Sequence, residues 1–332
     1  MIDNSTILLT GGTGTFGQAF TNIILNRHKV KKLIIFSRDE FKQYEMAKKF
    51  PEDKYPIRYF IGDIRDAERL ARAFSEVDYV IHAAAMKHVP ACEYNPFEAV
   101  RTNIVGAQNI VEAALDRNVK KVIILSTDKA VSPVNLYGAT KLAMEKIFIA
   151  SGALVGGRNT VFSLVRYGNV LGSRGSVLPL FLNIKKSGKN EYPITDERMT
   201  RFWITIEEGV ELVLHALIHG CGGEIFIPKI PSMKMSDLVK SIDKKAEIKI
   251  VGIRPGEKLH ETLVSEDEAR HSIDIGKYYV ILPEFIFKEG LNAGYNKFAS
   301  LAQGFTYRSD NNAEWLNVEQ LEAIIKDKFG NL

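Results

Sequence analysis

The first half of the chain alternates short apolar runs with longer segments whose apolar residues recur every three or four positions. Short runs rich in β-branched residues indicate buried strands, and the longer periodic segments indicate amphipathic helices. Strands are expected at 6–10, 32–37, 57–62, 77–83, 120–126 and 160–167. Helices are expected at 16–27, 40–49, 67–75, 97–116 and 137–151. This alternation predicts an α/β fold with a doubly wound parallel sheet that is covered on both faces.

The alternation loosens after residue 166. Segments 168–181 and 192–203 look loop-rich, whereas 205–218 predicts a helix and 223–230 a late strand. We therefore expect two domains. Residues 1–170 plus about 201–231 would form the doubly wound domain, and about 171–200 plus 232–332 a smaller, discontinuous α/β lobe.

Composition narrows the class of protein. The 332 residues are 45% hydrophobic and 25% charged, with a formal net charge of +4, which gives no sign of a nucleic-acid partner. No apolar run reaches the roughly 18 residues of a membrane span, and the N-terminus lacks the plan of a signal peptide, so a cytoplasmic protein is expected. Cys92 and Cys221 lie outside any CxxC pair, and His215 and His219 have no accompanying ligand, so no metal site is expected.

A glycine-rich segment, "TGGTGTFG" (10–17), follows the first expected strand and opens the first helix. Glycines at this junction permit a tight turn and let a pyrophosphate approach backbone amides at a helix N-terminus. The segment therefore predicts a Rossmann-type dinucleotide site, and the alternative is a glycine-rich turn that binds nothing. The expected cofactor residues in it are Gly11, Thr13, Gly14, Thr15, Phe16 and Gly17.

The end of the second strand indicates which dinucleotide is bound. An NAD-binding protein usually has an acid here for the adenosine ribose. In this chain Ser37 and Arg38 come first and Lys42 follows one turn later, which suits a 2′-phosphate and favours NADP. Asp39 could still serve a ribose. After the third strand, Asp63 and Ile64 are expected beside the adenine.

The stretch "LSTDKAVSPVNLYGATK" (125–141) places polar side chains at the carboxyl end of the fifth strand. Tyr137 and Lys141 are four residues apart, so a helix puts both on one face. A nearby ammonium stabilises phenolate, and we expect it to lower the tyrosine pKa from about 10 toward neutrality, which makes the phenol a usable acid/base. Thr127 adds a hydroxyl. The alternative is a surface helix with a salt link.

Together with the glycine loop, this Thr–Tyr–Lys set resembles the extended short-chain dehydrogenase/reductase superfamily, whose members move a hydride to or from nicotinamide. Asp128 and Lys129 add an acid and a base, and in this respect the chain resembles the nucleotide-sugar 4,6-dehydratases, which also expel water. It is most similar to the inverting UDP-N-acetylglucosamine 4,6-dehydratases of pseudaminic-acid biosynthesis, on segments that include "SRDEFKQYEM", "HAAAMKHVPACEYNP", "STDKA", "NLYGATK", "ITDERMTRFWI" and "GIRPGEKLHE". One departure is "AVSP", where that subgroup has "AxNP", which places Ser132 between the catalytic groups.

The resemblance implies a tightly bound NADP that is regenerated in each turnover, UDP-N-acetylglucosamine as substrate, C5 inversion, and a dimer-based homo-oligomer as large as a hexamer. It also implies the first step of pseudaminic-acid biosynthesis, and it leaves open whether the product serves flagellin glycosylation or another surface glycan. Tyr137 and Lys141 would act in oxidation at C4, with Thr127 on the developing carbonyl. Lys129 would take the C5 proton and Asp128 would protonate the departing C6 hydroxyl, although spacing leaves open which of these two takes the C5 proton.

The same resemblance implies the remaining site residues. Ala83 and Lys87, after the fourth strand, and the Tyr137–Lys141 pair would contact the cofactor. The UDP-sugar would be held by Lys87, Asn169, Arg174, Thr195, Met199, Arg254 and Glu257. Two other functions stay open: a UDP-sugar 4-epimerase or reductase, which needs no Asp128–Lys129 pair, and a protein that binds NADP without catalysis.

Overall fold

The computed structural model describes residues 2–173, 175–285 and 293–330. Its main body is a ten-stranded sheet in the order β16-β14-β15-β10-β6-β5-β4-β1-β2-β3. The parallel strands are β1 (Thr6–Thr10), β2 (Lys32–Ser37), β3 (Ile57–Ile61), β4 (Tyr79–His82), β5 (Lys121–Thr127), β6 (Val161–Tyr167) and β10 (Ile225–Pro228). An antiparallel extension adds β15 (Tyr278–Ile281), β14 (Ser272–Asp274) and β16 (Ala299–Ser300). The predicted fold class is confirmed.

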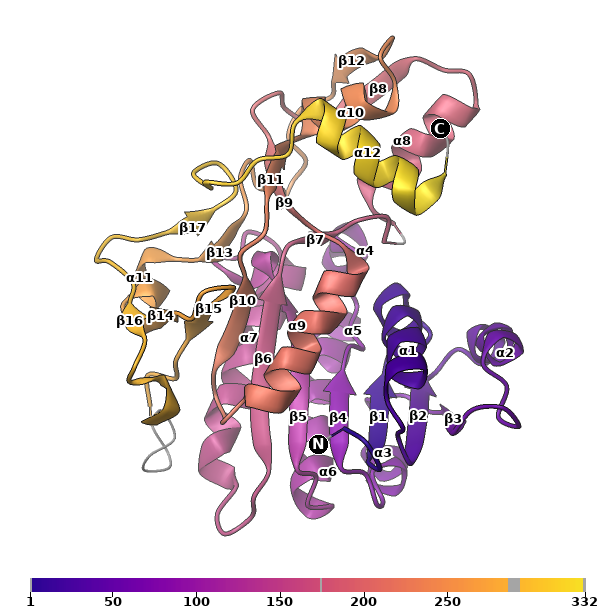
Figure 1. Cartoon of the computed structure of the whole chain (residues 1–332), viewed down its shortest axis with the longest axis vertical. Helices are drawn as coiled ribbons and strands as arrows, with labels where there is room; N and C mark the ends of the chain where they lie inside the picture. Colours follow the sequence, from indigo (N-terminus) through magenta and orange to yellow (C-terminus); the bar gives the residue numbers. More distant parts are fainter. Residues whose placement is uncertain (1, 174, 286–292, 331–332) are drawn as a thin grey trace.

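Helices cover both faces of this sheet (Figure 1). One face carries α1 (Thr15–Arg27) and α9 (Ile206–His219), which pack against each other, and the opposite face carries α3 (Ala67–Ala73), α6 (Gly106–Asp116) and α7 (Leu136–Ala150). The other helices of this region are α2 (Glu40–Lys49), α4 (Val89–Tyr94) and α5 (Pro96–Val100). The strand order reverses between β1 and β4, the point at which doubly wound sheets bind ligands.

A smaller lobe lies beyond the carboxyl ends of the parallel strands (Figure 1). Its own apolar core contains Phe181, Tyr192, Met233, Leu238 and Leu321, among others. The elements of the second half outside the large sheet are β7 (Asn169–Val170), α8 (Val177–Lys186), β8 (Glu191–Ile194), β9 (Thr200–Ile204), β11 (Ser232–Lys234), α10 (Met235–Ile242), β12 (Glu247–Ile250), β13 (Thr262–Val264), α11 (Glu266–Ala269), β17 (Tyr307–Arg308) and α12 (Val318–Phe329). The two-domain division stays a prediction, and the structure adds that β14, β15 and β16, which the sequence placed in the lobe, extend the large sheet.

Some elements differ from the sequence prediction. The segments 168–181 and 192–203, expected to be loops, contain β7, the start of α8, most of β8, and β9 up to Trp203. Every residue of β9 is buried, so its sequence "TRFWI" lacks the alternation of a half-exposed strand. The helix expected at 97–116 is divided by a π-helical turn, Arg101–Val105. In the ranges that the structure describes, every helix is too short or too polar to cross a membrane.

Arg166 joins the large sheet to the C-terminal part of the chain. Its side chain on β6 is fully buried and donates to Glu145 on α7, to Glu268 on α11 and to the Leu263 carbonyl, at 2.7–3.1 Å. Glu145 is buried as well, whereas the Glu268 side chain is 24% exposed. A buried guanidinium with every partner in place is tolerated, but loss of one partner leaves an uncompensated charge in the interior.

We predict that Arg166→Leu lowers the free energy of unfolding by about 3–5 kcal/mol in urea titrations, because Glu145 is left buried and unpaired. The double variant Arg166→Leu/Glu145→Leu should recover most of that loss, since the acidic partner that remains, Glu268, is partly exposed and keeps its hydrogen bonds to Ser265. Equal destabilisation of the single and double variants would show that packing of the side chain, not charge pairing, is what matters at this position.

Candidate functional site

The polar loop after β5 folds into a single 3-10 turn, Asp128–Ala130. Thr127, the last residue of β5, caps this turn: its hydroxyl donates to Asp128 Oδ1 at 2.8 Å and accepts from the Lys129 amide at 3.4 Å. Asp128 is completely buried. The predicted hydroxyl, acid and lysine are therefore contiguous at the carboxyl end of a central strand.

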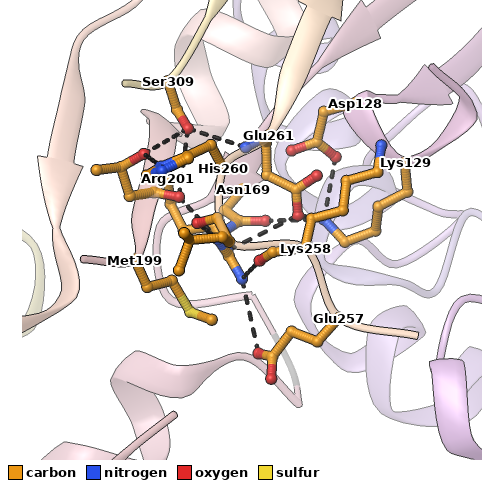
Figure 2. Close-up of polar contacts among 12 residues, drawn as sticks. Asp128, Lys129, Asn169, Met199, Arg201, Glu257, Lys258, His260, Glu261 and Ser309 are labelled. Carbon is orange, nitrogen blue, oxygen red and sulfur yellow. Dashed lines mark hydrogen bonds and ion pairs between the residues drawn. The ribbon is translucent and has the colours of Figure 1, made fainter. Parts of the chain in front are cut away.

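Lys129 lies among three acceptors that come from different parts of the chain (Figure 2). Its Nζ is 3.0 Å from Asp128 Oδ1, 3.3 Å from Asn169 Oδ1 and 3.3 Å from Glu261 Oε1. An ammonium has three N–H donors, so these partners can satisfy all of them. Arg201 Nε is 3.7 Å from the same Glu261 oxygen and carries the network on to Glu257, 3.6 Å from Arg201 Nη2.

The electrostatics of this cluster separate the charge states of the two carboxyl groups. Burial raises the pKa of Asp128, and the attraction of Lys129 does not cancel that effect. Burial opposes the charge of Glu261 too, but Lys129, Arg201 and Lys258 outweigh it and lower the Glu261 pKa. Burial also opposes the charge of Lys129, yet Asp128 and Glu261 together raise the Lys129 pKa. The pKa of Asp128 is thus shifted toward the protonated form, whereas the pKa values of Lys129 and Glu261 are shifted toward the charged forms.

Tyr137 and Lys141 lie on α7, and both are buried. Asn135 caps this helix through the Gly138 amide, and Gly138 lets the helix approach the catalytic loop, because a Cβ there would lie 2.2 Å from the Lys129 carbonyl oxygen. The expected lowering of the tyrosine pKa is wrong for this structure: burial raises the pKa of Tyr137 to about 12. The cation that opposes this rise is Lys129, not Lys141.

Lys141 points elsewhere. Its ammonium donates to the Leu125 carbonyl at 2.7 Å and to Met144 Sδ at 3.1 Å. Burial lowers the pKa of Lys141 to about 8, despite the opposing charge of Glu145. The helical spacing of the pair was correctly predicted, but the hydrogen bonds of the lysine lead to the end of β5.

The glycine-rich segment forms the turn between β1 and α1, beside the β1–β4 switch point. Gly14 is the N-cap of α1 and supplies no capping side chain, and a Cβ built on it would meet only the Gly11 carbonyl oxygen, at 3.1 Å. The space in front of this helix end therefore suits a phosphate group. Thr13 is buried in the turn, whereas Thr15, Phe16 and Ala83 are half-buried around it.

Four of the residues expected near the adenosine form two pairs, Asp39 with Lys42 and Arg38 with Asp63. Asp39 caps α2 by accepting from the Lys42 amide at 2.9 Å, and it pairs with the Lys42 ammonium at 2.6 Å. The Arg38 guanidinium is 63% exposed and lies 3.7 Å from Asp63. Ser37 accepts a hydrogen bond from Gln43, and Ile64 is buried.

The residues expected to hold the sugar nucleotide differ in their surroundings. Asn169 and Glu257 belong to the network around Lys129 and Arg201 (Figure 2). Thr195 and Met199 are buried together, with Thr195 Oγ1 3.1 Å from Met199 Sδ. Lys87 and Arg254 are exposed, and Arg174 lies outside the described residues.

Comparison with known proteins places the chain in a family. A family model described as "Polysaccharide biosynthesis protein" matches residues 7–283. A Campylobacter jejuni protein named UDP-N-acetylglucosamine 4,6-dehydratase (inverting) is 51% identical over 99% of this chain and 100% of that protein. The chain belongs to the polysaccharide biosynthesis protein family. The resemblance inferred from the sequence motifs is thereby confirmed.

Two further proteins, one relative and one solved structure, are similar to this chain over nearly its full length. A Rickettsia massiliae protein named UDP-glucose 4-epimerase is 41% identical over 98% of this chain and 96% of that protein. The X-ray structure of Pen from Bacillus thuringiensis superimposes with a TM-score of 0.90 at 38% identity, over 99% of each chain. Relatives that align with nearly the whole chain are therefore named for two different activities, dehydratase and epimerase. Family membership alone does not decide between these activities.

In this family member, three charged residues near Lys129 escaped the sequence prediction: Arg201, Lys258 and Glu261. Arg201 donates to backbone carbonyls of residues 200, 258 and 259 at 2.7–3.1 Å, and the Lys258 ammonium donates to the Val131 carbonyl. All three lie in segments that carried the resemblance, "DERMTRFW" and "GEKLHE". The available signal was a charge inside an otherwise apolar run, as for Arg201 in "TRFWI".

The histidines at helical spacing on α9 stack on each other, with ring centroids 4.4 Å apart. His215 also packs on Phe226 and Tyr278, so this pair belongs to the packing of α9 on the sheet. Among the described residues, no group of three or more His, Cys, Asp or Glu side chains is arranged to bind a metal ion.

Ser132, the residue that departs from the related subgroup, has a φ of +43°. Left-handed backbone is unfavourable for most residues but is accessible to asparagine. We predict that Ser132→Asn raises the free energy of unfolding by about 0.5–1 kcal/mol, because asparagine adopts this conformation at lower cost. Urea unfolding of Ser132→Asn beside the control Ser132→Ala tests this, and an asparagine variant no more stable than the alanine variant would contradict it.

Proposed function

We propose that the chain is an inverting UDP-N-acetylglucosamine 4,6-dehydratase that uses NADP. Its product would be UDP-2-acetamido-2,6-dideoxy-β-L-arabino-hexos-4-ulose, formed by C4 oxidation, loss of water across C5 and C6, and reduction at C6. The observation that carries the proposal is the ion pair of the fully buried Asp128 with the half-buried Lys129, 3.0 Å apart and beside Thr127. The dehydratase name of the C. jejuni relative supports it.

The roles of the residues follow from their environments. Tyr137 would accept the proton of the sugar 4-hydroxyl, with Lys141 fixed behind it at the end of β5, and Thr127 would donate to the developing carbonyl oxygen. Burial raises the pKa of Asp128, and its Oδ2 has no hydrogen-bond partner among the described residues. That oxygen could therefore hold the proton that the C6 hydroxyl needs to leave as water.

Lys129 would take the proton from C5, which the adjacent 4-keto group makes acidic. As an ammonium it has no free electron pair, so it must first lose one proton. Asp128 and Glu261, which raise the Lys129 pKa, make that loss harder. We therefore expect C5–H exchange to become faster as the pH rises toward the pKa of this lysine.

The turn between β1 and α1 fits the pyrophosphate of a dinucleotide, with Gly14 at the helix end. When bound there, nicotinamide would supply the oxidant at C4 and the reductant at C6. NADP is favoured over NAD because Asp39 is already engaged as the cap of α2, while Arg38 is exposed beside it. The assembly into homo-oligomers, the cytoplasmic location and the place in pseudaminic-acid biosynthesis stay predictions from the resemblance.

A UDP-sugar 4-epimerase is the second candidate, favoured by the epimerase name of the R. massiliae relative. Both reactions begin by oxidation at C4, which needs Thr127, Tyr137 and Lys141. They diverge at C5, because only the dehydratase removes that proton and expels the C6 hydroxyl. An epimerase gives no reason to bury Asp128 completely and to pair it with Lys129 at the end of β5.

Incubation of the purified protein with UDP-N-acetylglucosamine, and separately with UDP-glucose, distinguishes the candidates. We expect a 4-keto-6-deoxy product from UDP-N-acetylglucosamine, with one solvent deuterium at C5 when the reaction is run in D₂O. Proton NMR of that product reports the C5 configuration. Formation of UDP-N-acetylgalactosamine or UDP-galactose would instead establish an epimerase, and no turnover of either sugar would overturn both proposals.

The cofactor preference has its own test. We predict that Arg38→Ala weakens NADP binding about 10- to 100-fold, as expected for loss of one charge-assisted contact to a 2′-phosphate, and leaves NAD binding unchanged. Calorimetric titration of protein freed of its cofactor measures both affinities. Lys48→Ala removes a comparable exposed cation on α2 and serves as the control. Equal weakening of NADP and NAD by Arg38→Ala would contradict a phosphate contact.

A further inference from the structure

Glu261 is a buried carboxylate that the proposed mechanism does not use. Only 2% of the residue is exposed, and Oε1 is its single engaged side-chain oxygen, 3.3 Å from Lys129 Nζ and 3.7 Å from Arg201 Nε. Among the described residues, Oε2 has no hydrogen-bond partner. A carboxylate buried only for stability would be expected to satisfy both oxygens, since an unsatisfied one costs free energy.

The backbone holds Glu261 rigidly in this place. Its amide donates to Ser309 Oγ at 2.9 Å, and its carbonyl accepts from the Ser309 amide at 2.8 Å. The Ser309 hydroxyl also pairs with Thr200 Oγ1 at 2.7 Å, next to Arg201 on β9 (Figure 2). The carboxylate is thus presented to Lys129 from the C-terminal part of the chain by a fixed support.

Resting on the proposed function, we propose that Glu261 is a positioning residue that acts through Lys129: it fixes the lysine Nζ at the end of β5 and sets its affinity for a proton. The geometry supports this, because Glu261 supplies one of the three acceptors around that nitrogen. Arg201, which contacts both Glu261 and Glu257, links the same carboxylate to the residues expected to hold the sugar nucleotide.

The effect of replacing Glu261 on the Lys129 pKa depends on the charged and titratable groups that face this lysine. They are Asp128 in the same loop, Tyr137 on α7, Arg201 on β9, and Lys258 and Glu261 before β13. Glu261 stabilises the ammonium, and Arg201 destabilises it. Replacing Glu261 by glutamine removes one favourable negative charge and leaves Arg201 in place, so the lysine should release its proton at lower pH.

Glu261→Gln is the decisive variant. Competitive acetylation of Lys129 with acetic anhydride across about pH 8–12, a window that extends above the ordinary lysine pKa of about 10.4, followed by peptide mass spectrometry, reports its titration in the cofactor-loaded protein. We expect the midpoint to fall by about one pH unit or more. The pH profile of C5–H exchange into D₂O should move to lower pH by the same amount. A structural role alone would reduce the exchange rate at every pH without moving either midpoint.

Two further variants complete the test. Glu261→Asp keeps the charge but withdraws it by one methylene, so its midpoint should lie between those of the wild type and Glu261→Gln, and it is informative even where the glutamine variant folds poorly. Glu266→Gln makes the same charge change at an exposed position of α11 and should leave both profiles unchanged. An unchanged Lys129 midpoint in folded Glu261→Gln or Glu261→Asp overturns the inference.

The labelling experiment also separates this inference from the proposed function. If the wild-type protein does not dehydrate UDP-N-acetylglucosamine, the proposed function fails, yet the acetylation midpoints still measure the coupling between Glu261 and Lys129. If dehydration occurs and the midpoints do not move, the role of Glu261 fails alone.

Discussion

A lysine ammonium enclosed by protein must keep all of its acceptors, and this requirement organises the site. Lys129 stands on the loop after β5, but only Asp128 among its three acceptors comes from that loop. Asn169 arrives from β7 and Glu261 from the segment before β13. Removal of any one partner leaves buried polar atoms unpaired. The three segments must therefore come together in one fixed arrangement for the site to form.

A second cation, deeper in the molecule, is also held by residues from different segments of the chain. Arg166 on β6 binds Glu145 on the helix that carries Tyr137 and also Glu268 on α11. Each of these two cationic centres, Lys129 and Arg166, is thus held by acidic residues from the C-terminal part of the chain. Directional charge contacts fix orientation more strictly than apolar packing does, so these contacts tie the segment around β13 and α11 to the central strands β5 and β6.

The sequence predicts what depends on local pattern. The strands of the first half and helices such as α2 were predicted within one or two residues, because their periodicity is set by burial on the sheet. The loop after β5 was also identified, since its polar residues are consecutive. Glu261 could not be found in this way, because a single charge far along the chain looks like a surface residue until folding buries it. Arg201 left only a weak signal, as the one charge inside the buried run "TRFWI". The Tyr137 pKa was mispredicted for a related reason: spacing reveals a neighbouring lysine, but not the burial that outweighs it.

The distinction between epimerase and dehydratase is finally a matter of charge distribution. Oxidation at C4 is common to both, whereas elimination requires an acid that is still protonated and a base held close to it. Two ordinary carboxylates at neutral pH would both be ionised, and neither could give a proton to the C6 hydroxyl. Here the fully buried Asp128 has a raised pKa, while Glu261, surrounded by Lys129, Arg201 and Lys258, has a lowered one. The cations gathered around Glu261 therefore favour negative charge on that residue, whereas burial shifts the pKa of Asp128 in the direction that a proton donor in the proposed dehydration would need.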